Sequence, residues 1–516
     1  MKKIYFILII AVVIIAPSCK KDLNQLPIST ATTQTFYKQP SDFIQAVNAT
    51  YNSLRGYPDR LLFLSEVRSD NIYPTNDVGR DPDPVNNFSS GIASNTYVEE
   101  AWNADFGGIF RANTVLDQIA KNGSNVGSAA LATRLTAEAK FLRAFYYFDL
   151  IRYYGKLPII DHPVTASEAN KIGRSPVADV YALVIADLQF AVANLPANYT
   201  GIFPAYSATD VGRATKYAAE AILAEVYMTR SGPTYSIEGP GMGLSEWGLA
   251  VPLLQDIINS GLFVFNPNFG GATGIFSYTN QNPATNKEAV FDVMYLTGQS
   301  PVLGATFPWQ LIPQNYFNSL PAGNTPANGA LGQPSVSNNL LNSYAATDKR
   351  KSPTLHTTTF TYTGTPDAHA YFRKYLDTTK IPTSRFDWAI NFIAIRYTDI
   401  LMLKAECVLH GAPGSQATDV DSVVNQVRAR AGQPAIANVT LPQLFDERRR
   451  EFADEGLRWF DLQRSGSLIT IMNAWIAVED ATLHKMSQVI PNFLIYPVPQ
   501  SQLDAAPGLY TQNAGY

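Results

Sequence analysis

Two stretches of the sequence carry side chains that could bind a neutral, hydroxyl-rich ligand. Flat aromatic rings can cover the apolar face of a sugar ring, and amide, carboxylate or guanidinium groups can hydrogen-bond to its hydroxyls. The first stretch runs from Asp70 to Arg80 and the second from Tyr295 to Tyr316, and both have the composition of loops. The candidate ligand-binding residues are Asn71, Tyr73, Asn76, Asp77 and Arg80 in the first stretch, and Phe307, Trp309 and Gln310 in the second.

The same residues also have a purely structural interpretation. Aromatic side chains in loops often close a hydrophobic core, although loops are also where binding residues concentrate. For Trp309 both interpretations stay open. The first stretch contains no tryptophan, so Tyr73 is its aromatic contribution.

The motifs give no support for catalysis by a metal, a nucleotide cofactor or a nucleophilic serine. The sequence contains no G-x-S-x-G elbow, P-loop or dinucleotide fingerprint. The five histidines lack the His-x-x-x-His spacing of metal ligands. They are His162, His356, His369, His410 and His484. We therefore predict no catalytic residues, no metal and no cofactor.

One oxygen-rich segment could in principle hold calcium. Two prolines interrupt it and it lacks the EF-hand pattern, so a solvated turn is the preferred interpretation and calcium is the alternative. The residues concerned are Asp77, Asp81, Asp83, Asn86 and Asn87.

Composition narrows the class of ligand. The formal net charge is −4, which gives no basic footprint for nucleic acid. Aromatic residues make up 12% of the chain and charged residues only 16%, a balance that suits neutral polar ligands. A glycoside hydrolase would need two carboxylates at a defined separation, and with 43 Asp and Glu residues such pairs carry no information.

The basic run from Asp446 to Glu451 invites a phosphate-binding interpretation, but its spacing argues against one. Asp446 with Arg450, and Arg450 with Asp454, are four residues apart and would neutralise each other on a helix. We predict a solvated or interhelical ion-pair face.

The scaffold that must position these residues is built around the stretch Thr136 to Ile160. Its apolar residues recur every three or four positions and its phenylalanines widen that stripe, which predicts a helix buried on most of its surface. Gly155 and then Pro158 supply the stop signal, because a left-handed residue followed by proline ends a helix.

Further helices are expected along the chain, and some carry small residues that would allow close packing. They resemble degenerate tetratricopeptide-like helix pairs. The predicted helices are 42–54, 98–121, 176–194, 215–229, 249–260, 397–410, 419–431 and one that begins after a capping box of Thr440 and Gln443. Between 231 and 383 the pattern becomes loop-rich, with short strand-like runs at 289–295 and 357–362.

The N-terminus has the features of an export signal. Lys2 and Lys3 precede an apolar run from Ile4 to Ala16, which is too short to span a bilayer. Cys19 follows a small residue, so we predict that it is lipidated; an ordinary signal peptide with an incidental cysteine is the alternative. Cys407, the other cysteine, is expected in the core.

Six segments in the same order resemble the SusD/RagB family of outer-membrane glycan-binding lipoproteins. Taken together they extend the resemblance from the signal peptide to the last residue. The segments are AEAKFLRAFYYFDLIRYYGKLPII, GRATKYAAEAILAEVY, IRYTDILMLKAECVLHG, VNQVRARAG, ERRREFADEGLRWFDLQR and IYPVPQSQLDAAPGLYTQNAGY.

The resemblance implies a mainly α, SusD-like fold with tetratricopeptide-like helix pairs and a loop-rich inserted region. The implied parts are a lipoprotein signal peptide at 1–18, an N-terminal helical part at 19–230, a loop-rich variable region at 231–383 and a C-terminal helical part at 384–516. It further implies that loops near the two candidate stretches form the ligand platform.

In function, the resemblance implies a non-enzymatic lipoprotein, anchored through Cys19 at the outer-membrane cell surface. Such a protein captures oligosaccharide or polysaccharide and caps a SusC-like TonB-dependent transporter for import; no nucleic acid is involved. Two alternatives come from other classes, a surface glycoside hydrolase and a helical-repeat adaptor that binds a protein partner. The prediction stops at the class of ligand, because loops that set linkage preference carry no transferable code.

Overall fold

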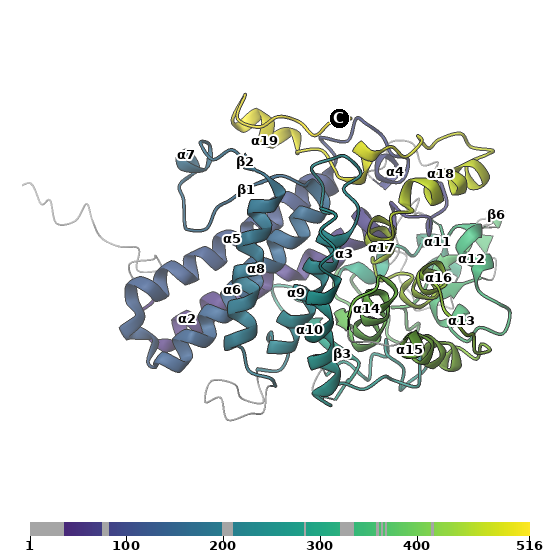
Figure 1. Cartoon of the computed structure of the whole chain (residues 1–516), viewed down its shortest axis with the longest axis horizontal. Coiled ribbons are helices and arrows are strands. Elements are labelled where there is room, and N and C mark those ends of the chain that lie inside the picture. The colour runs from purple at the N-terminus through teal and green to yellow at the C-terminus, as the bar shows by residue number, and fades with distance from the viewer. Residues whose placement is uncertain are drawn as a thin grey trace, which may run out of the picture.

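Helices make up most of the part of the chain that the structure describes (Figure 1). The computed structural model describes residues 36–74, 82–198, 210–282, 285–319, 335–357, 361–362, 365–366, 369–413 and 417–516. The predicted mainly α class is confirmed. The predicted signal peptide and Cys19 lie outside the described residues.

The central helix α6 (Ala129–Tyr154) is buried on every side from Ala137 to its end, apart from the half-buried Lys140. Its charged residues lie inside the protein and are paired there, as buried charges must be. Arg143 bonds both oxygens of Asp187 at 2.7 and 3.0 Å, and Arg134 contacts Glu138 at 2.7 Å. Gly155 ends the helix with φ at 68°, where a Cβ would collide with the carbonyl oxygen of Glu238. The predicted stop is therefore confirmed.

Helices that follow one another in the sequence pack in pairs, as the helix-pair prediction requires. Among the described residues, α8 (Val177–Asn194) is the one helix that is long and apolar enough to cross a membrane. It packs between α6 and α9 (Lys216–Ser231). The helices in contact, in order, are α5 (Thr96–Asn122), α6, α8 (Val177–Asn194), α9 (Lys216–Ser231), α10 (Trp247–Asn259), α14 (Tyr397–Leu409) and α15 (Ala417–Arg430).

The chain enters this bundle through a nearly continuous run of helical turns. The run consists of α2 (Pro40–Tyr51), the 3-10 turn η2 (Asn52–Gly56), α3 (Tyr57–Leu61) and the π-helical turn η3 (Leu62–Glu66). Short elements complete the first half, namely α4 (Pro82–Asn86), η4 (Gly123–Val126) and α7 (Ala166–Ala169).

The C-terminal helices α16, α17 and α18 lie on the right of the view in Figure 1, and α19 lies at the top. The predicted capping box is present, since Thr440 and Gln443 each hydrogen-bond the backbone of the other at the start of α16. The elements are α16 (Leu441–Phe452), α17 (Arg458–Ser465), α18 (Leu468–Glu479), η8 (Pro491–Leu494) and α19 (Gln500–Ala505).

All strands in the described residues form two-stranded antiparallel pairs. The longest pair joins β3 (Ala289–Val293) to β8 (Phe392–Arg396) and so ties the loop-rich region to the C-terminal helices. The remaining pairs are β1 (Leu157–Pro158) with β2 (Arg174–Ser175), β4 (Leu355–His356) with β7 (Tyr371–Phe372), and β5 (Thr361–Tyr362) with β6 (Thr365–Pro366). Short helices here are η6 (Phe307–Trp309), α11 (Gln314–Ser319), α12 (Asn338–Ser343) and α13 (Lys351–Thr354).

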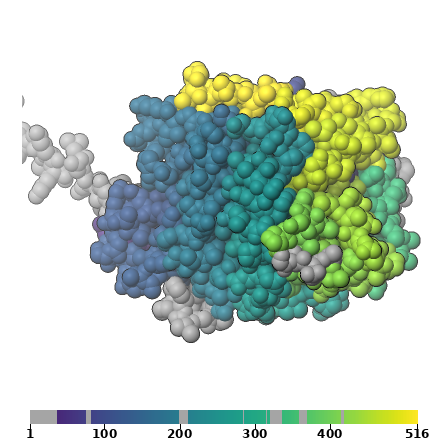
Figure 2. All heavy atoms as spheres, in the orientation of Figure 1, coloured from purple at the N-terminus to yellow at the C-terminus, as the bar shows by residue number. Residues whose placement is uncertain are grey.

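The largest hydrophobic cluster of the described residues runs through the molecule from Leu54 to Tyr496. Rings from distant segments meet in it; Phe141 of α6 lies 5.2 Å from Phe291 of β3, measured between ring centroids. Segments from the N-terminal half, the middle and the C-terminus abut one another on the face shown in Figure 2. The three chain parts therefore share one core.

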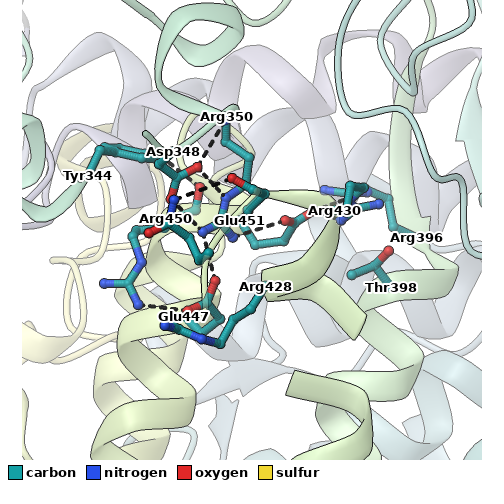
Figure 3. Close-up of polar contacts among 12 residues, drawn as sticks. Tyr344, Asp348, Arg350, Arg396, Thr398, Arg428, Arg430, Glu447, Arg450 and Glu451 are labelled. Carbon is teal, nitrogen blue, oxygen red and sulfur yellow. Dashed lines mark hydrogen bonds and ion pairs between the residues drawn. The ribbon is translucent and has the colours of Figure 1, made fainter. Parts of the chain in front are cut away.

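The two glutamates of the charged run in α16 belong to a buried ion-pair cluster, which we define as Glu447, Glu451, Arg350, Arg396 and Arg430 (Figure 3). Glu451 contacts the three arginines at 3.3, 2.7 and 2.5 Å. Interhelical ion pairing is thus confirmed.

The predicted partners of Arg450 were wrong. Arg450 pairs with Glu447 at 2.8 Å, one turn away on the same helix. Asp454 lies past the end of α16, where its φ of 71° takes it off the helix.

Candidate ligand-binding surface

The second candidate stretch separates into a buried and an exposed part. Phe307 is only 1% exposed, and its ring packs against Tyr375 and Phe392 at centroid distances of 4.8 and 5.3 Å. Phe307 is therefore a core plug, and its prediction as a ligand contact is wrong because no ring face reaches the surface.

Trp309, two residues further on, lies at the surface. Its ring is half-buried and meets the ring of Phe386 edge to face at 6.2 Å. The guanidinium carbon of Arg385 lies 4.7 Å from both ring centroids, within the range of a cation–π contact. Phe386 is 44% exposed. The indole Nε1 of Trp309 is buried and has no hydrogen-bond partner among the described residues.

Gln310 completes this surface and is fixed by Asp59 of α3. The Gln310 amide donates to Asp59 Oδ1 at 3.0 Å, and the Thr306 hydroxyl donates to Oδ2 at 2.5 Å. Desolvation raises the pKa of Asp59 to about 6, against the opposing effect of these two bonds. The orientation of the Gln310 amide leaves its carbonyl oxygen free of this contact.

Hydrogen bonds between two loops bring Trp309 and Gln310 next to Arg385 and Phe386. Ala305 and Trp388 exchange backbone hydrogen bonds of 2.9 and 3.1 Å, and the Gly298 amide donates to Asp387 Oδ2 at 3.0 Å. At Gly304 a Cβ would collide with the backbone of Asp387, so glycine allows the close approach. We name the resulting surface the Trp309 platform and define it as Trp309, Gln310, Arg385 and Phe386.

Asn71 in the first stretch is not a surface residue. It is fully buried, its amide donates to Glu66 Oε1 at 2.8 Å, and its carbonyl oxygen accepts from Arg449 Nε at 2.8 Å. Its prediction as a ligand contact is wrong, because both ends of the amide are occupied within the core.

Neighbouring Asp70 belongs to the same buried network. Burial alone would raise the pKa of Asp70, but the guanidinium groups of Arg449 and Arg458 outweigh that effect and hold it at about 2. Arg458 bonds both carboxylate oxygens, at 2.8 and 2.9 Å. This part of the first stretch is scaffold.

Tyr73 is half-buried and lies in a different setting from Trp309. Its ring is 4.0 Å from the His369 ring, and its backbone amide donates to the Ser335 carbonyl at 2.7 Å. Asn76, Asp77 and Arg80 lie outside the described residues. The structure therefore places Trp309 with Gln310, and it places Tyr73 against His369.

Sequence reasoning missed Arg385, Phe386 and Asp59. Arg385 and Phe386 follow Pro382, Thr383 and Ser384 in a loop, so the same combination of guanidinium and aromatic ring in a turn-rich segment was a usable signal. Their closeness to Trp309 depends on a backbone pairing between segments about eighty residues apart in sequence, Ala305 with Trp388.

The described residues contain no group of three His, Cys, Asp or Glu side chains that could hold a metal ion. Of the oxygen-rich segment considered for calcium, Asp83 and Asn86 are buried in α4, and the Asn86 amide donates to the Val67 carbonyl at 2.8 Å. Asp77 and Asp81 lie outside the described residues.

Two family models match the chain. Residues 356–516 match the SusD family, and residues 31–228 match a family described as starch-binding and associating with the outer membrane. A curated relative, the SusD-like protein P2 of Formosa agariphila, is 27% identical over 508 residues that cover 90% of this chain and 91% of that protein.

Solved structures agree in fold. Surface glycan-binding protein A from Bacteroides uniformis is 23% identical with a TM-score of 0.76, over 92% of this chain and 100% of that one. Surface glycan-binding protein A from Bacteroides thetaiotaomicron, solved in complex with laminarihexaose, is 22% identical with a TM-score of 0.75, over 93% and 100%.

Proposed function

The chain belongs to the SusD family, and from that premise we propose that it is a surface glycan-binding protein that captures oligosaccharide without cleaving it. The ligand would be held at the Trp309 platform. Related chains support the class of ligand, because one solved neighbour carries laminarihexaose and another is named a laminarin-binding SusD-like protein.

The observation that carries the proposal is the arrangement of Trp309 with Arg385 and Phe386. A sugar ring stacks on flat aromatic faces, and a fixed guanidinium and a fixed amide hydrogen-bond to its hydroxyls. Arg385 is held over both rings, and Gln310 is held by Asp59, so the polar groups are already oriented before a ligand arrives.

One observation favours capture over hydrolysis, namely the hydrogen bonds that engage Asp59, the acid that Gln310 contacts. A glycoside hydrolase uses one carboxylic acid to protonate the leaving group and a second carboxylate as nucleophile or base. Both oxygens of Asp59 accept hydrogen bonds from neighbouring side chains. Asp59 thus has the surroundings of a positioning residue.

We propose the location and the partner on the basis of the family and of the N-terminal sequence. We place the protein at the outer membrane, anchored through a lipid on Cys19, and we assign it a SusC-like TonB-dependent transporter as partner. In this scheme the protein acts as a lid that holds glycan above the transporter and closes to deliver it. More than one acyl chain at Cys19 would make such anchoring stable.

Calorimetry tests the proposal most simply. The chain from Lys20 onward is titrated with a panel of plant, host and microbial oligosaccharides that includes laminarihexaose, and product formation is followed by chromatography. We expect heat with one class of glycan, no product, and at least roughly tenfold weaker binding in Trp309→Ala, which loses the stacking face.

Phe110→Ala is the matched control, because Phe110 is 52% exposed on α5 and lies outside the platform. Its affinity should equal that of the unchanged protein. Product formation would support the hydrolase alternative instead. No heat with any glycan would favour a protein partner, or a lid without a sugar site of its own.

A further inference from the structure

A second hollow lies apart from the Trp309 platform, between the first helical turns of the chain and the end of β3. Its volume is about 530 Å³, which is within the range of about 300–1,000 Å³ that small-molecule sites occupy. Segments from three parts of the sequence line it. They are the end of α2 with η2 (Asn48 to Arg55), residues 210–213, and residues 292–296 together with Leu303.

Asp292 of β3 is a buried acid in this pocket whose carboxylate the fold leaves partly unpaired. It is 5% exposed, and its Oδ1 has no hydrogen-bond partner among the described residues. A buried polar atom without a partner costs free energy and needs an explanation, and an absent ligand is one such explanation. Asp292 contacts neither Trp309 nor any member of the buried ion-pair cluster in the described interactions.

Two of the three charged groups that surround Asp292 are paired with opposite charges. Arg213 pairs with Glu138 at 2.9 Å and with Asp210 at 2.6 Å. Arg55 donates to the Val302 carbonyl at 3.0 Å. Arg213 and Asp210 are thus paired with opposite charges, whereas Arg55 keeps its positive charge and has a buried Nε without a hydrogen-bond partner among the described residues, which a ligand oxygen could use.

The remaining lining mixes apolar and polar surfaces. Tyr51 is half-buried, Met294 is 41% exposed and Leu296 is 58% exposed, which gives the pocket apolar walls. Asn48 and Asn52 add exposed amides at its edge. A small neutral molecule with apolar faces and several hydroxyls matches this combination, and a single hexose unit has those properties.

We propose that this pocket is a second saccharide site, which takes one hexose unit and hydrogen-bonds a hydroxyl to Asp292. The choice of a sugar as ligand rests on the proposed function. The location does not, because it comes from the unpartnered oxygen and the volume of the pocket.

The two sites share one loop. Leu303 lines the pocket and pairs with Leu296, while Gly298 between them donates to Asp387, the residue after Phe386 of the platform. Arg55 of the pocket also donates to Val302 in the same loop. A ligand in the pocket therefore contacts a loop that helps to position the platform.

The protonation of Asp292 gives the site a pH dependence. Burial raises the pKa of Asp292 to about 8, against a smaller opposing effect of the Asn391 amide. The other titratable and charged groups that line the pocket are Arg55, Tyr51, Asp210, Arg213 and Tyr295. Below pH 8 Asp292 is a neutral acid that can donate to a hydroxyl oxygen, and above it the donor is lost.

Saturation-transfer NMR with methyl glycosides of glucose, galactose and mannose tests the inference on the chain from Lys20 onward. We expect at least one methyl hexoside to bind, Asp292→Leu to abolish the signal, and Trp309→Ala to leave it in place. Asn52→Trp, at an exposed edge position, should also abolish it by filling the pocket. This variant keeps the test decisive if Asp292→Leu does not fold.

Asp292→Asn is the matched variant, since it keeps the shape and a donor but removes the titration. It should bind equally at pH 6.5 and 9.5, whereas the unchanged protein should weaken roughly tenfold or more at the higher pH.

Two results overturn the inference. One is no signal from any of the three methyl hexosides; the other is a signal that survives both Asp292→Leu and Asn52→Trp. Laminarihexaose, measured in parallel, separates the two proposals. If Trp309→Ala still binds laminarihexaose while the pocket variants do not, the platform proposal fails and the pocket inference stands. If Trp309→Ala binds neither laminarihexaose nor the methyl hexosides, the pocket inference fails and the platform proposal stands.

Discussion

The buried ion-pair cluster around α16 and the Trp309 platform both use arginine, but the cluster stabilises the fold and the platform is available to a ligand. In the cluster, Glu451 is completely buried and meets three guanidinium groups. At the platform, Arg385 lies over two aromatic rings and has no carboxylate partner among the ion pairs of the described residues. Paired charges hold together helices that are far apart in sequence, whereas a guanidinium at the surface without a carboxylate partner can still donate to a ligand.

The largest expected effect comes from breaking the cluster. Glu451→Gln leaves Arg350, Arg396 and Arg430 without their shared carboxylate, and uncompensated buried charge costs about 3–5 kcal/mol. We expect the free energy of unfolding, measured in urea, to fall by that amount.

Asp446→Asn on the same helix is the control for this change. Asp446 is exposed, so its substitution should alter the free energy of unfolding by no more than about 0.5 kcal/mol. Equal losses in the two variants would contradict the assignment of the cluster as the stabilising feature.

The second expected effect is a loss of stability as the pH rises above 6. The folded-state pKa of Asp292 is raised to about 8, so the folded protein keeps a proton that the unfolded chain has already released. Stability therefore falls as the pH rises, by about 2 kcal/mol between pH 6 and pH 8 from this group alone. Asp292→Asn should remove that contribution, seen as a flatter plot of unfolding free energy against pH. An unchanged plot would show that Asp292 is not buried in this way.

The scaffold carboxylate Asp70 should behave in the opposite sense. Its pKa of about 2 lies below the unfolded value, so its stabilising effect is present above pH 4 and is lost as the pH falls towards 2. At pH 7, Asp70→Asn should lower the free energy of unfolding by about 2 kcal/mol, and the difference from the unchanged protein should vanish near pH 2. A difference that persists at pH 2 would point to lost packing rather than lost charge.

The smallest effect is expected at the platform. Arg385→Ala removes a guanidinium that would donate to glycan hydroxyls, so we expect a several-fold loss of glycan affinity in calorimetry. It also removes a cation–π contact within the protein, so the free energy of unfolding should fall by only about 0.5–1 kcal/mol. The glycan affinity of Arg385→Lys should lie between that of the unchanged protein and that of Arg385→Ala, because an ammonium keeps the charge but loses the planar donor set. A large loss of stability would place Arg385 with the scaffold instead.

The sequence predicted the helical scaffold because periodicity is local. The helix around Phe141, its stop at Gly155 and the capping box of Thr440 all depend on neighbours within a few residues. The prediction that the Thr136–Ile160 helix is buried followed from its aromatic content.

The candidate site was harder to predict, because exposure depends on distant segments. Phe307 and Trp309 belong to one 3-10 turn, and only the packing of Tyr375 and Phe392 decides that the first is a plug. Asn71 has the composition of a loop residue, yet Arg449, 378 positions away, binds it into the core. Local composition contains neither fact.

A crystal structure with the oligosaccharide that gives the strongest calorimetric signal tests the central claim most directly. The account predicts a sugar ring stacked on Trp309, with Arg385 and Gln310 within hydrogen-bonding distance of its hydroxyls and the glycosidic bonds intact. An oligosaccharide bound elsewhere with the Trp309 surface bare, or a cleaved one, would contradict it.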